Sequence, residues 1–188
     1  MIKIGITGSI ASGKTTASKI LSKNRGPLFS ADKQVKKLYK NDKFIKLIIN
    51  KFNIEKKVGL KDFLKRKILK DKINIKKLEK IIHPLVRKEM RKFSNQNKHK
   101  KILFYEIPLL IENKLINNFD IVIFIKAKKA IRLKRFKLKG GDLKLFNIMN
   151  NKQLLDIKKM KFCDYIIVNE KNLDILKKKL LDIMKLYD

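Results

Sequence analysis

The chain has 188 residues, with 49 Lys and Arg against 17 Asp and Glu, so its formal net charge is +32. That length suits a single domain with at most a small appended lobe, and a hydrophobic content of 44% excludes a wholly disordered chain. No apolar run reaches the roughly 20 residues needed to span a bilayer. The apolar start, Met1 to Ile6, runs straight into Gly8, which is not the pattern of a secretory signal, and the single cysteine, Cys163, cannot form an internal disulfide. We therefore expect a cytoplasmic protein.

Runs of apolar residues without polar alternation predict buried strands, and apolar residues at helical spacing predict helices. In chain order the predicted strands are 2–7, 27–31, 101–107, 120–125 and 164–168. The predicted helices are 14–24, most of 32–97, 128–138, 142–160 and 171–187. Strands that alternate with helices predict a parallel sheet covered on both faces. The fold class is therefore α/β, a three-layer fold around a five-stranded parallel sheet.

The crossover between the second and third strands is about seventy residues long and mainly helical. It is far longer than a simple connection requires. We interpret the chain as one domain over 1–188, with a helical substrate lobe over 32–100 inserted in its core.

A phosphate-binding loop (P-loop) follows the first strand and leads into the first helix. Its pattern is two glycines, Gly8 and Gly13, followed by Lys14 and Thr15. Such a loop points backbone N–H groups at phosphate oxygens, and the helix N-terminus adds partial positive charge. We expect Lys14 to reach the β- and γ-phosphates of a nucleoside triphosphate and Thr15 to coordinate Mg²⁺. The motif alone does not separate kinases from GTPases, helicases or other ATPases. The predicted nucleotide-binding residues here are Ser9, Ile10, Ala11, Ser12, Gly13, Lys14, Thr15 and Thr16.

Asp32 directly follows the second predicted strand, at the sheet edge where ligands bind in open α/β folds. A carboxylate there suits a base that accepts the proton of an attacking hydroxyl. A helix N-cap explains Asp32 equally well, because a helix is predicted from Lys33 and Asp is a favoured cap.

Several separated segments resemble one family, the dephospho-coenzyme A kinases. The segments are GITGSIASGKTT from Gly5, SAD at 30–32, IIHPLVRKEM at 81–90, IPLLIEN at 107–113, RLKR at 132–135, Gln153, and DYIIVNE at 164–170. The resemblance implies ATP- and Mg²⁺-dependent phosphorylation of the ribose 3′-hydroxyl of dephospho-CoA, with Asp32 as the catalytic base. It also implies a mobile lid, here at 132–155. We expect the protein to act as a monomer.

The resemblance implies substrate contacts for Asp32, His83, Arg87, Leu109, Leu110 and Glu112. Each has a plainer interpretation from the residues alone. His83 precedes Pro84, which disfavours helical backbone at His83, so that His83 can instead be a packed residue at a kink. The two leucines can be core, Glu112 can pair with a basic residue of the lobe, and Arg87 can lie on a solvated basic face.

In the lid, Arg135 is the predicted catalytic arginine, because a guanidinium clamps developing phosphoryl charge well. The family has a second lid arginine a few residues later, where Lys139 stands here and is the predicted ATP-binding substitute; Lys137 is its alternative. Asn169, just after the last strand, is predicted near the adenine, or is simply a turn former. Ser30 stands where the family commonly has an acid.

Two other functions remain compatible with the sequence. Another small-molecule or nucleotide P-loop kinase shares the core but not the His83–Pro84 segment. A nucleic-acid-stimulated ATPase would use the +32 charge. The lysines are scattered along almost every helix, and Lys, Ile and Asn are all abundant, which favours compositional bias over a specific nucleic-acid partner.

Overall fold

The computed structural model describes residues 1–54 and 72–187. It divides into two units, Met1–Ser30 with Asn97–Asp188 and Ala31–Gln96, and each is described by itself. The predicted lobe residues 55–71 lie outside the described part of the chain. None of the described helices combines the length and apolar character that crossing a bilayer requires.

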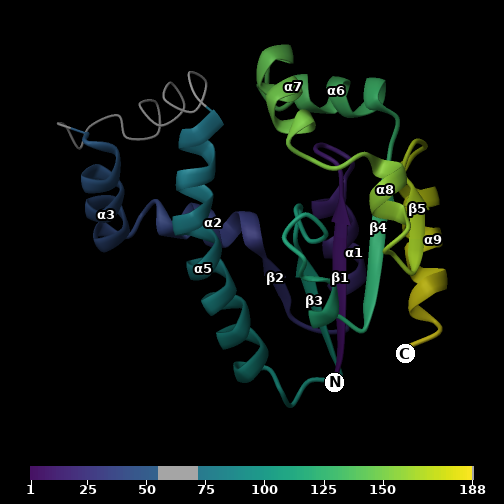
Figure 1. Cartoon of the computed structure of the whole chain (residues 1–188). Helices are drawn as coiled ribbons and strands as arrows, with labels where there is room; N and C mark the ends of the chain where they lie inside the picture. The colour runs from purple at the N-terminus through teal and green to yellow at the C-terminus, as the bar shows by residue number, and fades with distance from the viewer. Residues whose placement is uncertain (55–71, 188) are drawn as a thin grey trace. The chain divides into compact units, whose positions relative to one another are not determined.

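The first unit is built on a parallel sheet, and the described strands appear in the order β2-β3-β1-β4-β5. Their bounds are β1 Ile2–Gly8, β2 Leu28–Ser30, β3 Ile102–Glu106, β4 Ile121–Lys126 and β5 Tyr165–Val168. The prediction of five parallel strands is confirmed. Figure 1 shows β1 between β3 and β4, so the strand that carries the P-loop is central.

Helices α1 (Lys14–Ser22) and α9 (Leu173–Met184) contact each other and pack on one face of this sheet. The shared core joins alternate strand residues to the apolar stripes of both helices: Ile4, Ile6, Ile102, Phe104, Ile121, Ile123, Ile125, Ala17, Leu21, Leu176, Leu180 and Ile183. The intervening strand residues, such as Leu103, Tyr105 and Phe124, are buried too. Both faces are therefore covered, which explains why the strands lack polar alternation.

The remaining helices of the first unit are η1 (Ile116–Asn118), α6 (Lys129–Lys137), α7 (Leu143–Asn151) and α8 (Asp156–Met160). The prediction of one helix over 142–160 is wrong, because 152–155 separates α7 from α8. Within that break the backbone N–H of Leu154 donates to Oε1 of Glu112 at 3.0 Å. A tertiary hydrogen bond has thus replaced a helical one, which local propensity cannot reveal.

The second unit contains α2 (Ala31–Leu38), α3 (Asp42–Phe52) and α5 (Lys72–Gln96). Its core joins residues of α3 and α5, among them Phe44, Ile48, Leu78 and Ile82.

The expectation that Pro84 interrupts a helix is wrong, because α5 continues through it. Pro84 is exposed, so water can satisfy the carbonyl four residues earlier that loses its N–H partner. Apolar residues on both sides of Pro84, including Ile82 and Val86, contribute to the core that holds the helix together.

Candidate functional site

The loop between β1 and α1 folds tightly because its two glycines have positive φ angles, 148° at Gly8 and 100° at Gly13. A Cβ atom at Gly8 would collide with the backbone oxygen of Ile125, and one at Gly13 with the side-chain amide of Asn169. Both positions thus require glycine for conformation and for space. Gly13 is the N-cap of α1 and places no side chain on the first N–H groups of the helix, which suits an anion.

Lys14 and Thr15 take up distinct positions beside this loop. The Lys14 side chain is buried, and its Nζ donates to the Ser9 carbonyl at 2.8 Å, so the ammonium lies across the loop. The Thr15 hydroxyl donates to Oε1 of Glu106 at 2.5 Å. Glu106 ends β3, is buried, and pairs in register with Ser30 of β2.

Thr15 and Glu106 therefore present a hydroxyl and a carboxylate at one point of the sheet edge. Mg²⁺ prefers oxygen ligands and in nucleotide sites takes one or two from the protein, the rest from phosphates and water. Among the described residues no cluster of three or more His, Cys, Asp or Glu could hold a metal alone. The pair fits a magnesium ion that arrives with the nucleotide.

Arg135 and Asn169 brace the far end of the loop. Nδ2 of Asn169 donates to the Ser12 carbonyl at 2.8 Å. Nη1 of Arg135 donates to the same carbonyl at 3.4 Å and to the carbonyl of Asn169 at 3.1 Å. The structure thus brings both predicted residues to the P-loop, where their contacts are with its backbone.

Arg132 is a buried loop contact that the sequence analysis missed. Its Nε donates to the Ala127 carbonyl at 3.1 Å, and its Nη1 donates to Oδ1 of Asn150 at 2.9 Å and to the Ile10 carbonyl at 3.4 Å. Burial lowers the pKa of the Arg132 guanidinium, and the negative charge of Asp156 opposes that shift. Arg132 lies one turn before Arg135 on α6, so both side chains lie on the same face of the helix. This spacing could have suggested from the sequence that Arg132 reaches the same loop as Arg135.

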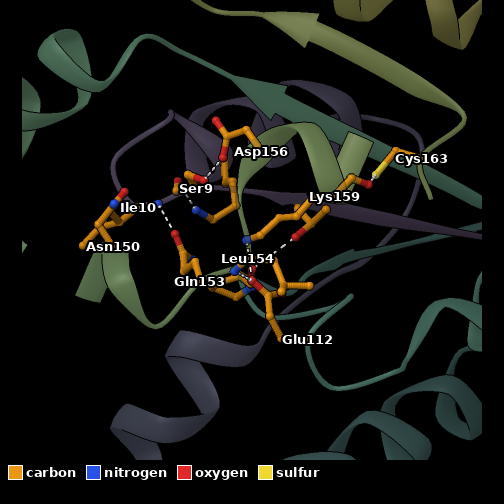
Figure 2. Close-up of polar contacts among 12 residues, drawn as sticks. Ser9, Ile10, Glu112, Asn150, Gln153, Leu154, Asp156, Lys159 and Cys163 are labelled. Carbon is orange, nitrogen blue, oxygen red and sulfur yellow. Dashed lines mark hydrogen bonds and ion pairs between the residues drawn. The ribbon is translucent and has the colours of Figure 1, made fainter. Parts of the chain in front are cut away.

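The break between α7 and α8 contacts the start of the P-loop (Figure 2). The backbone N–H of Ile10 donates to Oε1 of Gln153 at 2.8 Å. The Ser9 hydroxyl donates to Oδ1 of Asp156. Gln153, which was predicted to belong to the lid, and Asp156, the residue directly after the lid's predicted end at 155, therefore hold two consecutive loop residues.

The segment after β3 packs against the sheet and against α8. The Thr7 hydroxyl donates to the Pro108 carbonyl at 3.2 Å. Leu110 is fully buried and has no exposed surface for a substrate, whereas Leu109 is half-buried. Glu112 pairs with Lys159 of α8 at 2.6 Å, so its observed basic partner belongs to the first unit and not to the lobe.

The other predicted substrate residues belong to the second unit. Asp32 is the second residue of α2, so it lies inside the first turn and is not the N-cap that a helix start at Lys33 would require. On α5, His83 is half-buried and Arg87 is exposed. Their substrate contacts stay predictions.

Two predicted nucleotide contacts are on exposed positions of the first unit. Lys139 lies in the turn after α6, and Lys137 ends that helix. Thr16 is exposed on α1. Their contacts with ATP also stay predictions.

Cys163 offers a test of the packing around α8. Its thiol donates to the Lys159 carbonyl at 3.3 Å, and burial, followed by the charge of Asp164, raises its pKa to about 12. Since the thiolate is the reactive form, we expect iodoacetamide at pH 8 to modify the folded protein at least about a hundredfold more slowly than the urea-unfolded protein. Mass spectrometry follows this single thiol directly; equal rates in both states would contradict the burial.

Known proteins that are similar to this chain are kinases, which agrees with the P-loop site described above. The family model described as dephospho-CoA kinase matches residues 2–174. The chain belongs to the dephospho-CoA kinase family. The dephospho-CoA kinase of Bartonella henselae is 34% identical over 187 residues, with 97% of this chain and 96% of that protein covered. That of Rickettsia typhi is 33% identical over 192 residues, with coverage of 98% and 97%.

Solved structures of this and other kinases share the fold. A dephospho-CoA kinase from Campylobacter jejuni superposes with a TM-score of 0.68 at 27% identity, with 97% of this chain and 95% of that chain covered. A Thermus thermophilus protein gives a TM-score of 0.81 at 23% identity, covering 100% and 98%. A shikimate kinase from Bacteroides thetaiotaomicron gives 0.59 at 13% identity, covering 98% and 97%. The core of this dephospho-CoA kinase family member is thus that of a P-loop kinase.

Proposed function

We propose that the chain transfers the γ-phosphoryl group of ATP to the ribose 3′-hydroxyl of dephospho-CoA, giving CoA and ADP, the last step of coenzyme A synthesis. The observation that carries this proposal is a fully formed P-loop, with Lys14 and Thr15 in place, in a chain that the dephospho-CoA kinase model matches over residues 2–174. In the transfer, the bond between the γ-phosphorus and the β–γ bridging oxygen breaks, and a bond to the ribose oxygen forms.

The nucleotide phosphates bind the P-loop backbone and the N-terminus of α1. Lys14 neutralises charge on the β- and γ-phosphates, and Arg135 adds positive charge next to Ser12. Asn169 holds the loop from the adenine side. Mg²⁺, held by the Thr15 hydroxyl with Glu106 nearby, would supply charge neutralisation of the phosphates when it is bound.

The helical unit and the segment after β3 supply the residues proposed to bind dephospho-CoA. The predicted lobe over 32–100, most of which belongs to the unit Ala31–Gln96, binds the substrate, and Asp32 takes the proton of the ribose hydroxyl. His83, Arg87, Leu109 and Glu112 contact the substrate. The region 132–155 acts as the lid that excludes water during transfer.

A coupled assay of ADP release tests the proposal. Dephospho-CoA should stimulate ADP release strongly over a control without acceptor, and mass spectrometry should identify CoA as the product. Shikimate and deoxyadenosine are informative rival acceptors, because kinases for both share this fold at 13–16% identity. Turnover with a rival but not with dephospho-CoA would overturn the proposal.

Because the net charge is +32, the same assay should also be run with added RNA or DNA. We propose that the protein acts as a cytoplasmic monomer without a specific nucleic-acid partner. RNA or DNA at physiological salt should therefore leave ADP release unchanged. Light scattering after gel filtration checks the monomer; stimulation by polynucleotide would support the ATPase alternative.

A further inference from the structure

A buried ion pair lies beneath the break between α7 and α8. Lys159 is 0% exposed, and its Nζ is 2.6 Å from Oε1 of Glu112. The second carboxylate oxygen, Oε2, is buried and has no hydrogen-bond partner among the described residues. Burying two charges costs free energy that an apolar pair of the same volume avoids, so stability alone is a weak reason for this pair.

The same carboxylate holds the backbone of the break. Oε1 of Glu112 accepts a hydrogen bond from the N–H of Leu154 at 3.0 Å. The residue before Leu154 and the first residue of α8, two positions after it, are the ones that reach the P-loop. Gln153 binds the N–H of Ile10, and Asp156 binds the hydroxyl of Ser9.

Figure 2 shows these contacts as one continuous chain from Lys159 through Glu112 and the break to the P-loop. The loop end of this chain needs support. Ala11, the next residue after Ile10, has a left-handed φ of 57°, a backbone conformation that is unfavourable for an L-residue. A loop pinned at Ser9 and Ile10 keeps the conformation that binds phosphate and loses less entropy on binding.

We propose that Lys159 is a positioning residue for the nucleotide: through Glu112 it fixes the break between α7 and α8. Gln153 in that break and Asp156 at the start of α8 then hold the P-loop in its phosphate-binding conformation. The inference rests on the proposed function only for the binding of a nucleotide. It assigns no substrate contact to Lys159 itself.

The experiment measures ADP affinity by calorimetry and unfolding temperature for three variants. Lys159→Met removes the ammonium and leaves an unpaired buried carboxylate. Glu112→Leu with Lys159→Met removes both charges and the acceptor for Leu154. Gln153→Leu removes the acceptor for Ile10 at a half-buried position. Lys158→Met, an exposed neighbour on α8, controls for the loss of one positive charge.

All three variants should weaken ADP binding on the order of tenfold, the effect of losing a charge-assisted or buried hydrogen bond. Lys158→Met should stay within twofold of the wild type. The variant that combines Glu112→Leu with Lys159→Met should have a higher unfolding temperature than Lys159→Met alone, because no unpaired charge remains. Its affinity for ADP should stay as low as that of Lys159→Met. Combining Gln153→Leu with Lys159→Met should cost less than the product of the single effects, since both act through one chain of contacts.

Affinity that recovers together with unfolding temperature in the double variant would overturn the proposal, because the pair would then be structural. Should the Lys159 variants not fold, Gln153→Leu decides, and ADP affinity within twofold of the wild type would overturn it. A wild type that binds ADP but does not phosphorylate dephospho-CoA would defeat the proposed function and leave this comparison intact.

Discussion

Replacing Lys14 by Met is expected to lower kcat/KM for ATP by about 10³-fold while the protein remains folded. Lys14 is 8% exposed, and its ammonium is fixed across the P-loop by the Ser9 carbonyl at 2.8 Å. A fixed, desolvated donor aimed at developing charge is worth about 10²–10³-fold, and here the donor is also a full charge. Steady-state kinetics with an unfolding curve for each variant measures the effect.

Methionine matches the length of the lysine stem and lacks its charge, so the fold should tolerate it. The matched control is Lys19→Met, which removes an exposed lysine from the same helix and should leave kcat/KM within about twofold. Lys14→Met with kcat/KM within tenfold of the wild type would contradict the assignment of Lys14 to phosphate charge.

Replacing Asp32 by Asn is expected to lower kcat by about 10²–10⁴-fold, the range for loss of a general base, with little change in KM for dephospho-CoA. Asn keeps the shape of the side chain and cannot take the proton. Asp32 also lies in the first turn of α2, where a negative charge stabilises the helix by only about 0.3–1 kcal/mol. Loss of activity should therefore far exceed loss of stability.

Asp42→Asn is the matched control, since Asp42 occupies the first turn of α3 in the same unit. It should show the small stability effect without the kinetic one. Asp32→Asn with full turnover of dephospho-CoA would exclude the carboxylate as the base and leave it a role in the helix alone.

The sheet and the P-loop could be predicted because their signals are local. Each buried strand is an apolar run, and Gly8 and Gly13 stand at fixed spacing from Lys14. The link from Ile10 to Gln153 spans 143 positions, and no local pattern encodes it. The break at Leu154 has the same origin, since its hydrogen-bond partner Glu112 is 42 positions away.

Among the residues that surround the loop, the sequence analysis singled out Arg135 and Asn169 but not Arg132 or Lys159. Arg135 was singled out for catalysis, and its observed contacts are with the carbonyls of Ser12 and Asn169. Arg132 was passed over, because a basic residue in a Lys-rich helix carries no sign of burial. Lys159 gave no signal for the same reason, although it is fully buried.

The pairing of β1 has a consequence for the synthesis of the protein. Ile2 of β1 pairs with Ile102 of β3, and Ile4 pairs with Ile121 of β4. The strand that carries the P-loop therefore leaves the ribosome about a hundred residues before either neighbour. Since synthesis adds about 5–20 residues per second, the apolar residues of β1 have no neighbouring strand for several seconds or longer. The phosphate-binding loop cannot take its final form until β4 and the more distant residues that hold the loop, Gln153 and Asn169, have also been made. The apolar strand β1 is therefore without its sheet partners during most of the synthesis of the chain.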